Sequence, residues 1–304
     1  MSMRYPAGFI SAFYNPLKNP DAPTIGTATA TFSGITVAFT APANVGGSAI
    51  TSYIATAKRT SDGVLFTASG ASSPITVTGL TAVAFTATVV AVNSYGPSAS
   101  SAASNSVTPL PAIGSALGGG FFAGQISTAG NSIADYNLVV GPVASAQSFL
   151  KWKLVNTSTA GTTSDIDGPA NSAAMNDVTH PAAQFCEGLT IGGFSDWYMP
   201  AANELEVCYY NLKPTTANNT LTSGVNANAV PARASNYTLG TPAQTTAAAF
   251  ITGTGAEAFD NDIYWSSTQV SATYARRLIF GNGVLYGDNK NVDCKVRAIR
   301  RVAV

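Results

Sequence analysis

Short runs of β-branched and aromatic residues, separated by turn-forming residues, recur along the segment from Asp21 to Pro109. Proline, glycine, asparagine and serine fill the gaps between the runs. Short strands at this regular spacing predict a β-sandwich, because two packed sheets need a turn about every ten residues. The predicted strands are Ile35–Phe39, Ile50–Ile54, Ile75–Thr78 and Phe85–Val92.

The composition limits the classes of partner. Charged residues make up only 10% of the 304 residues, and small hydroxyl and amide residues replace them, which is typical of β-rich extracellular surfaces. The formal net charge is zero, which argues against a general nucleic-acid partner. We expect no membrane insertion, because no apolar run reaches the length of a membrane span.

The expected place of action is outside a cell, yet the chain shows no secretory signal. Met1–Leu17 lacks the continuous apolar stretch of a signal peptide. Three cysteines, Cys186, Cys208 and Cys294, allow at most one disulfide, and free buried thiols are an equal alternative. An outward-facing protein without a signal peptide fits a virion component, which is assembled in the host cytoplasm and released by lysis.

Residues 1–20 are rich in aromatic residues and proline and are too short to fold alone. We interpret them as a docking peptide that orders against other virion proteins, since solvated tails seldom carry so many aromatics. The alternative is a frayed terminus.

The segment 21–109 carries a family pattern at Pro23, Ile35–Pro42, Ser48–Tyr53, Gly79–Leu80 and Asn93–Gly96. With these residues it resembles a fibronectin type III domain along its whole length. Phe39 replaces the usual core tryptophan of that family, and Phe85 stands near the position of its corner tyrosine. These departures affect local packing and leave the predicted fold intact, and the implied role is that of a spacer.

The glycine-rich segment 110–120 is predicted to be a linker, and 121–304 is predicted to be one α+β domain. Two stretches in it have helical features: Pro181–Gly188, with a proline suited to the first turn, and Ala201–Leu212, which Pro214 ends. The tail Ile263–Val302 is predicted to form short strands joined by Asn/Gly turns.

Three blocks of the C-terminal domain carry a family pattern. They are Cys186–Pro200 followed by Asn203–Leu205, then Tyr264–Thr268, then Val296–Arg300. These blocks resemble the family typified by the C-terminal domain of Lcl, a collagen-like bacterial adhesin. The resemblance implies a C-type-lectin-like domain, akin to the fold of the formylglycine-generating enzyme. The stretch Trp152–Met175 is similar to versions of this domain in phages.

Four residues of these blocks are expected to be structural. Trp197 and Trp265 combine a large apolar area with one N–H donor, which suits the core of a small domain rich in loops. Arg297 and Arg300 fall on opposite faces if the last strand is regular. We therefore expect one arginine to bond carbonyl groups within the fold and the other to face solvent.

The sequence lacks a convincing catalytic constellation, and we expect no enzymatic activity. His180 is the only histidine, and no other signal supports a nucleophile site around it. Glu204 and Glu206 lie two positions apart on a predicted helix and so point in different directions.

We expect no cofactor. Calcium is the one metal considered, with candidate ligands Glu257, Asp260 and Asp262.

The stretch Gln269–Lys295 is the predicted ligand-binding surface. Recognition surfaces favour tyrosine and arginine, and adjacent large residues here break the alternation expected of a buried strand. The segment 276–301 carries seven basic and two acidic residues, an excess of +5 that favours an anionic ligand. The candidate ligand-binding residues are Tyr274, Arg276, Arg277, Leu278, Leu285, Tyr286 and Asp288.

Together these features predict a mainly β protein with an α+β C-terminal domain, acting as a bacteriophage receptor-binding protein such as a tail fibre or adhesin. The expected partners are other virion proteins and a polysaccharide or protein of the host cell surface. We expect a homo-oligomer, with a trimer as one option. The alternative function is a structural decoration, neck or tail protein whose C-terminal domain binds no host ligand.

Overall fold

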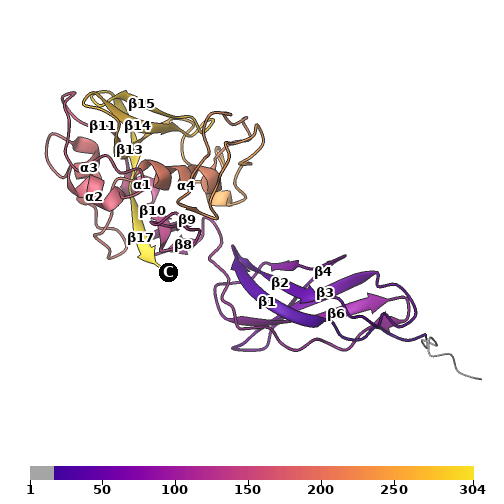
Figure 1. Cartoon of the computed structure of the whole chain (residues 1–304). Coiled ribbons are helices and arrows are strands. Elements are labelled where there is room, and N and C mark those ends of the chain that lie inside the picture. Colours follow the sequence, from indigo (N-terminus) through magenta and orange to yellow (C-terminus); the bar gives the residue numbers. More distant parts are fainter. Residues whose placement is uncertain (1–16) are drawn as a thin grey trace, which may run out of the picture. The chain divides into compact units, whose positions relative to one another are not determined.

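A computed structural model describes residues 17–304 of the chain, which divides into two compact units between Ala112 and Ile113 (Figure 1). Most of the predicted docking peptide, residues 1–16, lies outside the described residues. Its end belongs to the first unit, because the backbone N–H of Lys18 donates to Gly46 and its carbonyl accepts from Asn93. Strands hold 36% of the residues and helices 11%, so the predicted mainly β fold class is confirmed.

The first unit is a sandwich of two antiparallel sheets (Figure 1). Along β6 (Phe85–Asn93) every second side chain is buried, as expected for a strand that faces the inside of a sandwich. The rings of Phe39 and Tyr53, from opposite sheets, pack with centroids 4.7 Å apart. One sheet has the order β1 (Thr24–Thr31), β2 (Gly34–Thr40), β5 (Ile75–Thr78); the other has β4 (Leu65–Gly70), β3 (Ser52–Arg59), β6 (Phe85–Asn93), β7 (Gly96–Pro97).

A serine repeat extends the edge of this sandwich beyond the two-residue β7. Ser98, Ser101 and Ser104 lie three residues apart, and each hydroxyl accepts a backbone N–H of β6 at 2.9–3.0 Å. Each serine N–H in turn donates to a β6 carbonyl. The backbone groups of β6 are therefore satisfied without a regular edge strand, which leaves less of the strand open to pairing with another chain.

The second unit, 113–304, contains two five-stranded sheets and four short helices. The first sheet has the order β12 (Ala229–Val230), β9 (Gly120–Ile126), β10 (Tyr136–Val140), β17 (Ile299–Ala303), with β8 (Ala116–Leu117) also paired to β9. The second has the order β11 (Gln147–Lys151), β16 (Asp293–Arg297), β13 (Ile263–Gln269), β14 (Tyr274–Ile279), β15 (Leu285–Asn289). The helices are α1 (Val143–Ala146), α2 (Gly168–Ala173), α3 (Pro181–Glu187) and α4 (Ala202–Leu212), with a 3₁₀ turn at Ala248–Phe250.

The two predicted helices are present as α3 and α4, whereas α1 and α2 were not predicted because they are too short to show a period. The predicted linker was wrong over residues 113–120, because β8 and the start of β9 already pair there. Within the described residues no helix is long and apolar enough to cross a membrane.

Helix α4 contacts β9 of the first sheet and both β13 and β14 of the second (Figure 1). Its position between the sheets buries side chains all around it, including Glu204 and Glu206. Two apolar clusters form the core of the unit: Tyr209, Tyr264 and Phe280 belong to one, and Trp197 and Trp265 to the other. The three cysteines are buried and free.

The expectation for Arg297 and Arg300 requires a correction, because both are buried. The chain leaves the second sheet after Arg297 and enters the first at Ile299, so the final segment is not one regular strand. Arg297 donates to the carbonyls of Gly141 and Glu257 at 2.9 and 2.8 Å. Arg300 pairs with Asp196 at 2.7 Å and therefore does not face solvent.

Candidate recognition site

The seven predicted ligand-binding residues do not form one surface. In the antiparallel register of β14 and β15, Arg276 faces Gly287, Arg277 faces Tyr286, and Leu278 faces Leu285. Because neighbouring residues of a strand point to opposite faces, the set divides in two. One face carries Tyr274, Arg276, Leu278 and Leu285, and the other carries Arg277, Tyr286 and Asp288.

Leu278 was wrongly predicted to be at the surface: it is fully buried in the core beneath the sheet. Arg277 is also mostly enclosed, with 12% of its side chain exposed, and it forms an ion pair with Asp288. Its guanidinium lies 4.6 Å from the centre of the Tyr286 ring and donates to the Cys294 sulfur at 3.1 Å. These residues bind each other and hold the two strands together.

The excess of positive charge in segment 276–301 is compensated within the domain. Six of the seven basic side chains have a carboxylate partner, and acids distant in sequence provide most of these partners. Lys290 is the seventh; it is buried and donates to the carbonyl of Thr157 at 3.0 Å. The predicted anionic ligand therefore loses its main support. The pairs are Arg276–Asp165, Arg277–Asp288, Lys295–Asp260, Arg297–Glu257, Arg300–Asp196 and Arg301–Glu204.

Adjacent arginines should respond differently to substitution. We expect Arg277→Ala to lower the free energy of unfolding by about 2 kcal/mol, since it removes charged hydrogen bonds from a mostly enclosed site. Arg276 is 36% exposed and 3.3 Å from Asp165, so Arg276→Ala should cost only about 0–1 kcal/mol. Urea denaturation of the two variants measures the difference, and equal losses would contradict this assignment.

The candidate calcium ligands are engaged with cations. Glu257 accepts from Arg297 at 2.9 Å and from the backbone N–H of Val143 at 2.8 Å. Asp260 pairs with Lys295, whose ammonium also lies 3.8 Å from Asp262 and so occupies the space between the two carboxylates. In the described part of the chain, no group of three or more His, Cys, Asp or Glu side chains is placed to hold a metal ion.

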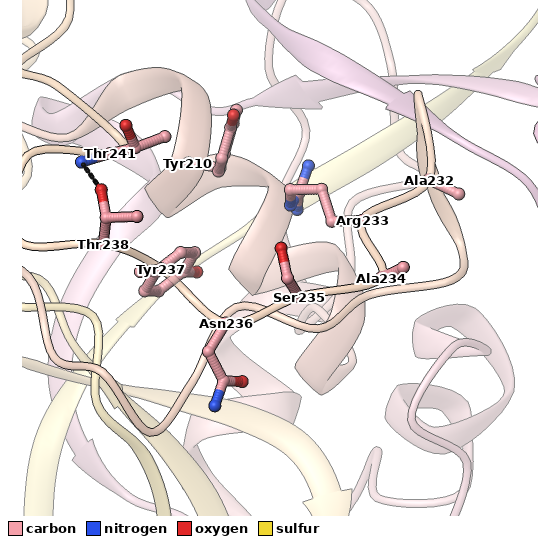
Figure 2. Close-up of a pocket in the computed structure, with 9 residues that line it drawn as sticks. All are labelled: Tyr210, Ala232, Arg233, Ala234, Ser235, Asn236, Tyr237, Thr238 and Thr241. Atoms are coloured by element: carbon pink, nitrogen blue, oxygen red, sulfur yellow. Dashed lines mark hydrogen bonds between the residues drawn. The ribbon is translucent and has the colours of Figure 1, made fainter.

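Two solvent-open cavities lie where the loop 222–241 passes α4. The larger, about 300 Å³, is shown in Figure 2, with Tyr210 of α4 facing Arg233 and Tyr237 of the loop. At its rim the backbone N–H of Thr241 donates to the Thr238 hydroxyl at 3.0 Å (Figure 2). The remaining lining residues of this cavity are Ala232, Ala234, Ser235 and Asn236.

The smaller cavity, about 200 Å³, shares Asn236 with the larger one. Arg276 and Leu285 line it, so two of the predicted ligand-binding residues do border a concave site. The other lining residues come from α4 and from the loop, and none of them was predicted to bind a ligand. They are Asn203, Glu206, Thr222, Ser223, Gly224 and Val225.

Glu206 lines the smaller cavity and bonds to side chains that line the larger one. Its carboxylate accepts from the Tyr237 hydroxyl at 2.5 Å and from the Asn226 amide at 2.6 Å, and it pairs with Arg233. The Arg233 guanidinium lies 4.1 Å from the centre of the Tyr210 ring. Burial and the nearby Glu206 charge raise the pKa of Tyr237, so its phenol stays a hydrogen-bond donor.

Two further side chains fix the course of the loop. The Asn219 amide donates to the carbonyls of Thr238 and Pro242 at 3.1 and 2.9 Å, and the Asn226 amide donates to that of Asn203 at 2.9 Å. The sequence feature that could have pointed to this site is the presence of Asn219 and Asn226 in a stretch without strand or helix periodicity. Such a signal is weak, because most asparagines in loops only form turns.

Glu204 has other partners than Glu206. It accepts from the Tyr198 hydroxyl at 2.6 Å, from the backbone N–H of Ala201 at 2.8 Å and from Arg301 at 2.8 Å. These bonds connect the first turn of α4 to β17. Burial raises the pKa of Glu204.

His180 lies within a network that has the order of a catalytic triad. Its Nε2 is 2.8 Å from the Thr159 hydroxyl, and its Nδ1 is 3.0 Å from Asp177. However, His180 and Thr159 are both buried, and Lys153 donates to the Thr159 hydroxyl oxygen at 2.9 Å. An oxygen that accepts this bond from a cation is a poor nucleophile. The arrangement instead connects the loop after β11 to α3.

Stability should decrease as the pH falls below about 6.5, the ordinary pKa of histidine, because of His180. Burial lowers its pKa from 6.5, and the nearby Lys153 and Lys290 add to the effect, although Asp177 opposes it. The unfolded chain therefore binds the proton first as the pH falls. The slope contributed by one group is at most about 1.4 kcal/mol per pH unit.

The measurement is urea denaturation at a series of pH values above and below 6.5 for the wild type and for His180→Gln. Since His180 is the only histidine, the difference between their pH profiles isolates its contribution. Parallel profiles would show that His180 keeps its ordinary pKa in the folded protein.

One protein family matches a long segment within the second unit. Residues 143–300 match the Lcl C-terminal domain, and because the match covers more than half of the chain, the chain belongs to this family. The sequence matches none of the curated proteins.

Several solved structures are similar to part of the chain. They include titin kinase with its flanking domains, 24% identical with TM-score 0.27, covering 30% of this chain and 17% of that one. Titin module A71 from human cardiac muscle is 28% identical with TM-score 0.26, covering 30% and 91%. A human fourth FNIII domain is 20% identical with TM-score 0.29, covering 37% and 96%. This chain thus spans less than a fifth of the titin kinase structure.

Proposed function

We propose that this chain is an attachment protein of a bacteriophage particle, which binds a ligand on the host surface through its C-terminal unit. The N-terminal sandwich acts as a spacer, and residues 1–20 connect the chain to other virion proteins. The C-terminal unit has a C-type-lectin-like role as a binding domain and performs no catalysis. Membership of the Lcl C-terminal domain family, whose namesake is an adhesin, supports a binding role.

The observation that carries the proposal is the pair of adjoining cavities around Asn236. Concave, solvent-open sites lined by tyrosine, arginine and amide side chains are typical of recognition sites. The residues that most resemble catalytic groups, His180 and Glu204, are buried and bonded within the fold. A decoration protein that only packs within the particle would have no need of these cavities.

The test is binding of the labelled full chain to a panel of bacterial strains, measured by flow cytometry. We expect binding to a subset of strains, and we expect Ala234→Trp, which fills the larger cavity, to abolish it. Ala234 is exposed, so the variant should keep the wild-type melting temperature. Failure to bind any strain that a particle carrying this protein infects would refute the attachment role and favour the decoration alternative.

A further inference from the structure

We infer that the ligand is an uncharged saccharide, held across the two cavities on either side of Asn236. The inference rests on the proposed attachment role and specifies the chemistry of its ligand. It departs from the anionic polymer that the basic C-terminal segment suggests, because the charges, the polar groups and the sizes of the cavities all favour a neutral polyhydroxyl molecule.

The charges around the cavities are already balanced. Arg233 and Arg276 are the cations of the lining, and they pair with Glu206 and Asp165 respectively. A sulfated or carboxylated ligand would have to displace one of these carboxylates or leave it beside a like charge, and both alternatives cost free energy. An uncharged ligand leaves the two ion pairs intact.

The other polar groups of the lining are amides and hydroxyls. Each can both donate and accept hydrogen bonds, as the hydroxyl groups of a saccharide do. Ser235 and Asn236 are exposed at the rim of the larger cavity, and Asn203 and Ser223 line the smaller one. Asn236 lines both cavities, so one amide lies within reach of ligand groups in either.

Apolar surface accompanies these groups in each cavity. Tyr210 and Tyr237 line the larger cavity, and Val225 and Leu285 line the smaller. The C–H face of a sugar ring packs on aromatic and aliphatic surface of this kind, while its hydroxyls bond to the surrounding polar groups. The volumes of about 300 and 200 Å³ are at or below the lower end of small-molecule sites. They suit single sugar units of a chain rather than a folded protein surface.

The experiment is binding of the labelled full chain to an array of neutral, sialylated and sulfated oligosaccharides, followed by titration of the strongest ligands. We expect the bound set to consist of uncharged structures. Their affinity should change by less than about twofold when NaCl rises from about 0.1 to 1 M, although the Debye length falls from about 10 to 3 Å. A bound set restricted to sulfated or sialylated structures, or an affinity that falls steeply with salt, would overturn the inference.

Two matched variants test where the saccharide binds. Ala234→Trp fills the larger cavity and should weaken binding by at least about tenfold. Ala272→Trp places the same side chain on the exposed turn between β13 and β14, outside both cavities, and should bind like the wild type. Equal binding by Ala234→Trp would overturn the assigned location.

The two proposals fail in different ways. If the chain binds host cells but no oligosaccharide, the saccharide inference is wrong and the attachment role remains, with a protein as its ligand. If the chain binds neither cells nor oligosaccharides, both proposals are wrong.

Discussion

Replacing Arg297 with alanine is expected to lower the free energy of unfolding of the C-terminal unit by about 3–5 kcal/mol. The arginine is buried, and it bonds the carbonyl of Gly141 together with the carbonyl and the carboxylate of Glu257. Its guanidinium also lies 4.6 Å from the centre of the Phe259 ring. Burial lowers its pKa to about 10, so it remains charged at neutral pH. The variant leaves these acceptors without their donor.

Tryptophan fluorescence during urea denaturation is a suitable measurement, because all three tryptophans of the chain lie in the C-terminal unit. Lys151→Ala is the control. It breaks an ion pair with Asp293 at 2.5 Å, but both side chains are about one third or more exposed, and the expected cost is about 0–1 kcal/mol. Similar losses for the two variants would mean that Arg297 is not the buried structural cation described above.

Replacing Glu206 with alanine is expected to lower the stability of the same unit by about 3 kcal/mol and to abolish ligand binding. Arg233 loses its carboxylate partner, and its Nε atom is already buried without a hydrogen-bond partner in the described structure. The Tyr237 hydroxyl and the Asn226 amide lose their acceptor in the same substitution. We therefore expect the loop 222–241 to become mobile and susceptible to proteolysis.

Limited proteolysis and oligosaccharide binding, measured on the same preparations, separate the local effect from the global one. Asp165→Ala is the matched control, since it removes the carboxylate partner of Arg276, the other lining arginine, at an exposed position. It should change stability by no more than about 1 kcal/mol and leave the loop resistant to protease. A Glu206→Ala variant with an intact, binding-competent loop would contradict the role assigned to Glu206.

The elements that could be predicted from the sequence are those that depend on residues close together in the chain. Alternating apolar residues located β2 and β6, because a half-buried strand repeats every two residues. Pro181 and Pro214 marked the start of α3 and the region just beyond the end of α4. The serine repeat beside β6 was missed, because its period of three belongs to neither a strand nor an α-helix.

For the candidate site, the sequence located only part of one wall. The predicted ligand-binding set included Arg276 and Leu285, which do line the smaller cavity, but it also included Leu278, which is buried in the core. Most of the lining comes from loop 222–241, whose path depends on Glu206 and Asn219. A loop without periodicity carries no local signal for such distant hydrogen bonds.

The sequence by itself determined the mainly β class, the sandwich, the two principal helices and the family to which the C-terminal unit belongs, since each depends on residues close together in the chain. Only the tertiary structure decided which charged side chains pair with each other. Seven basic residues crowd the last part of the sequence, yet folding brings acids such as Asp165, Asp196 and Glu257 beside them. Coulomb interactions depend on distance in space, and for that reason a cluster of charge in the sequence became a set of ion pairs in the fold.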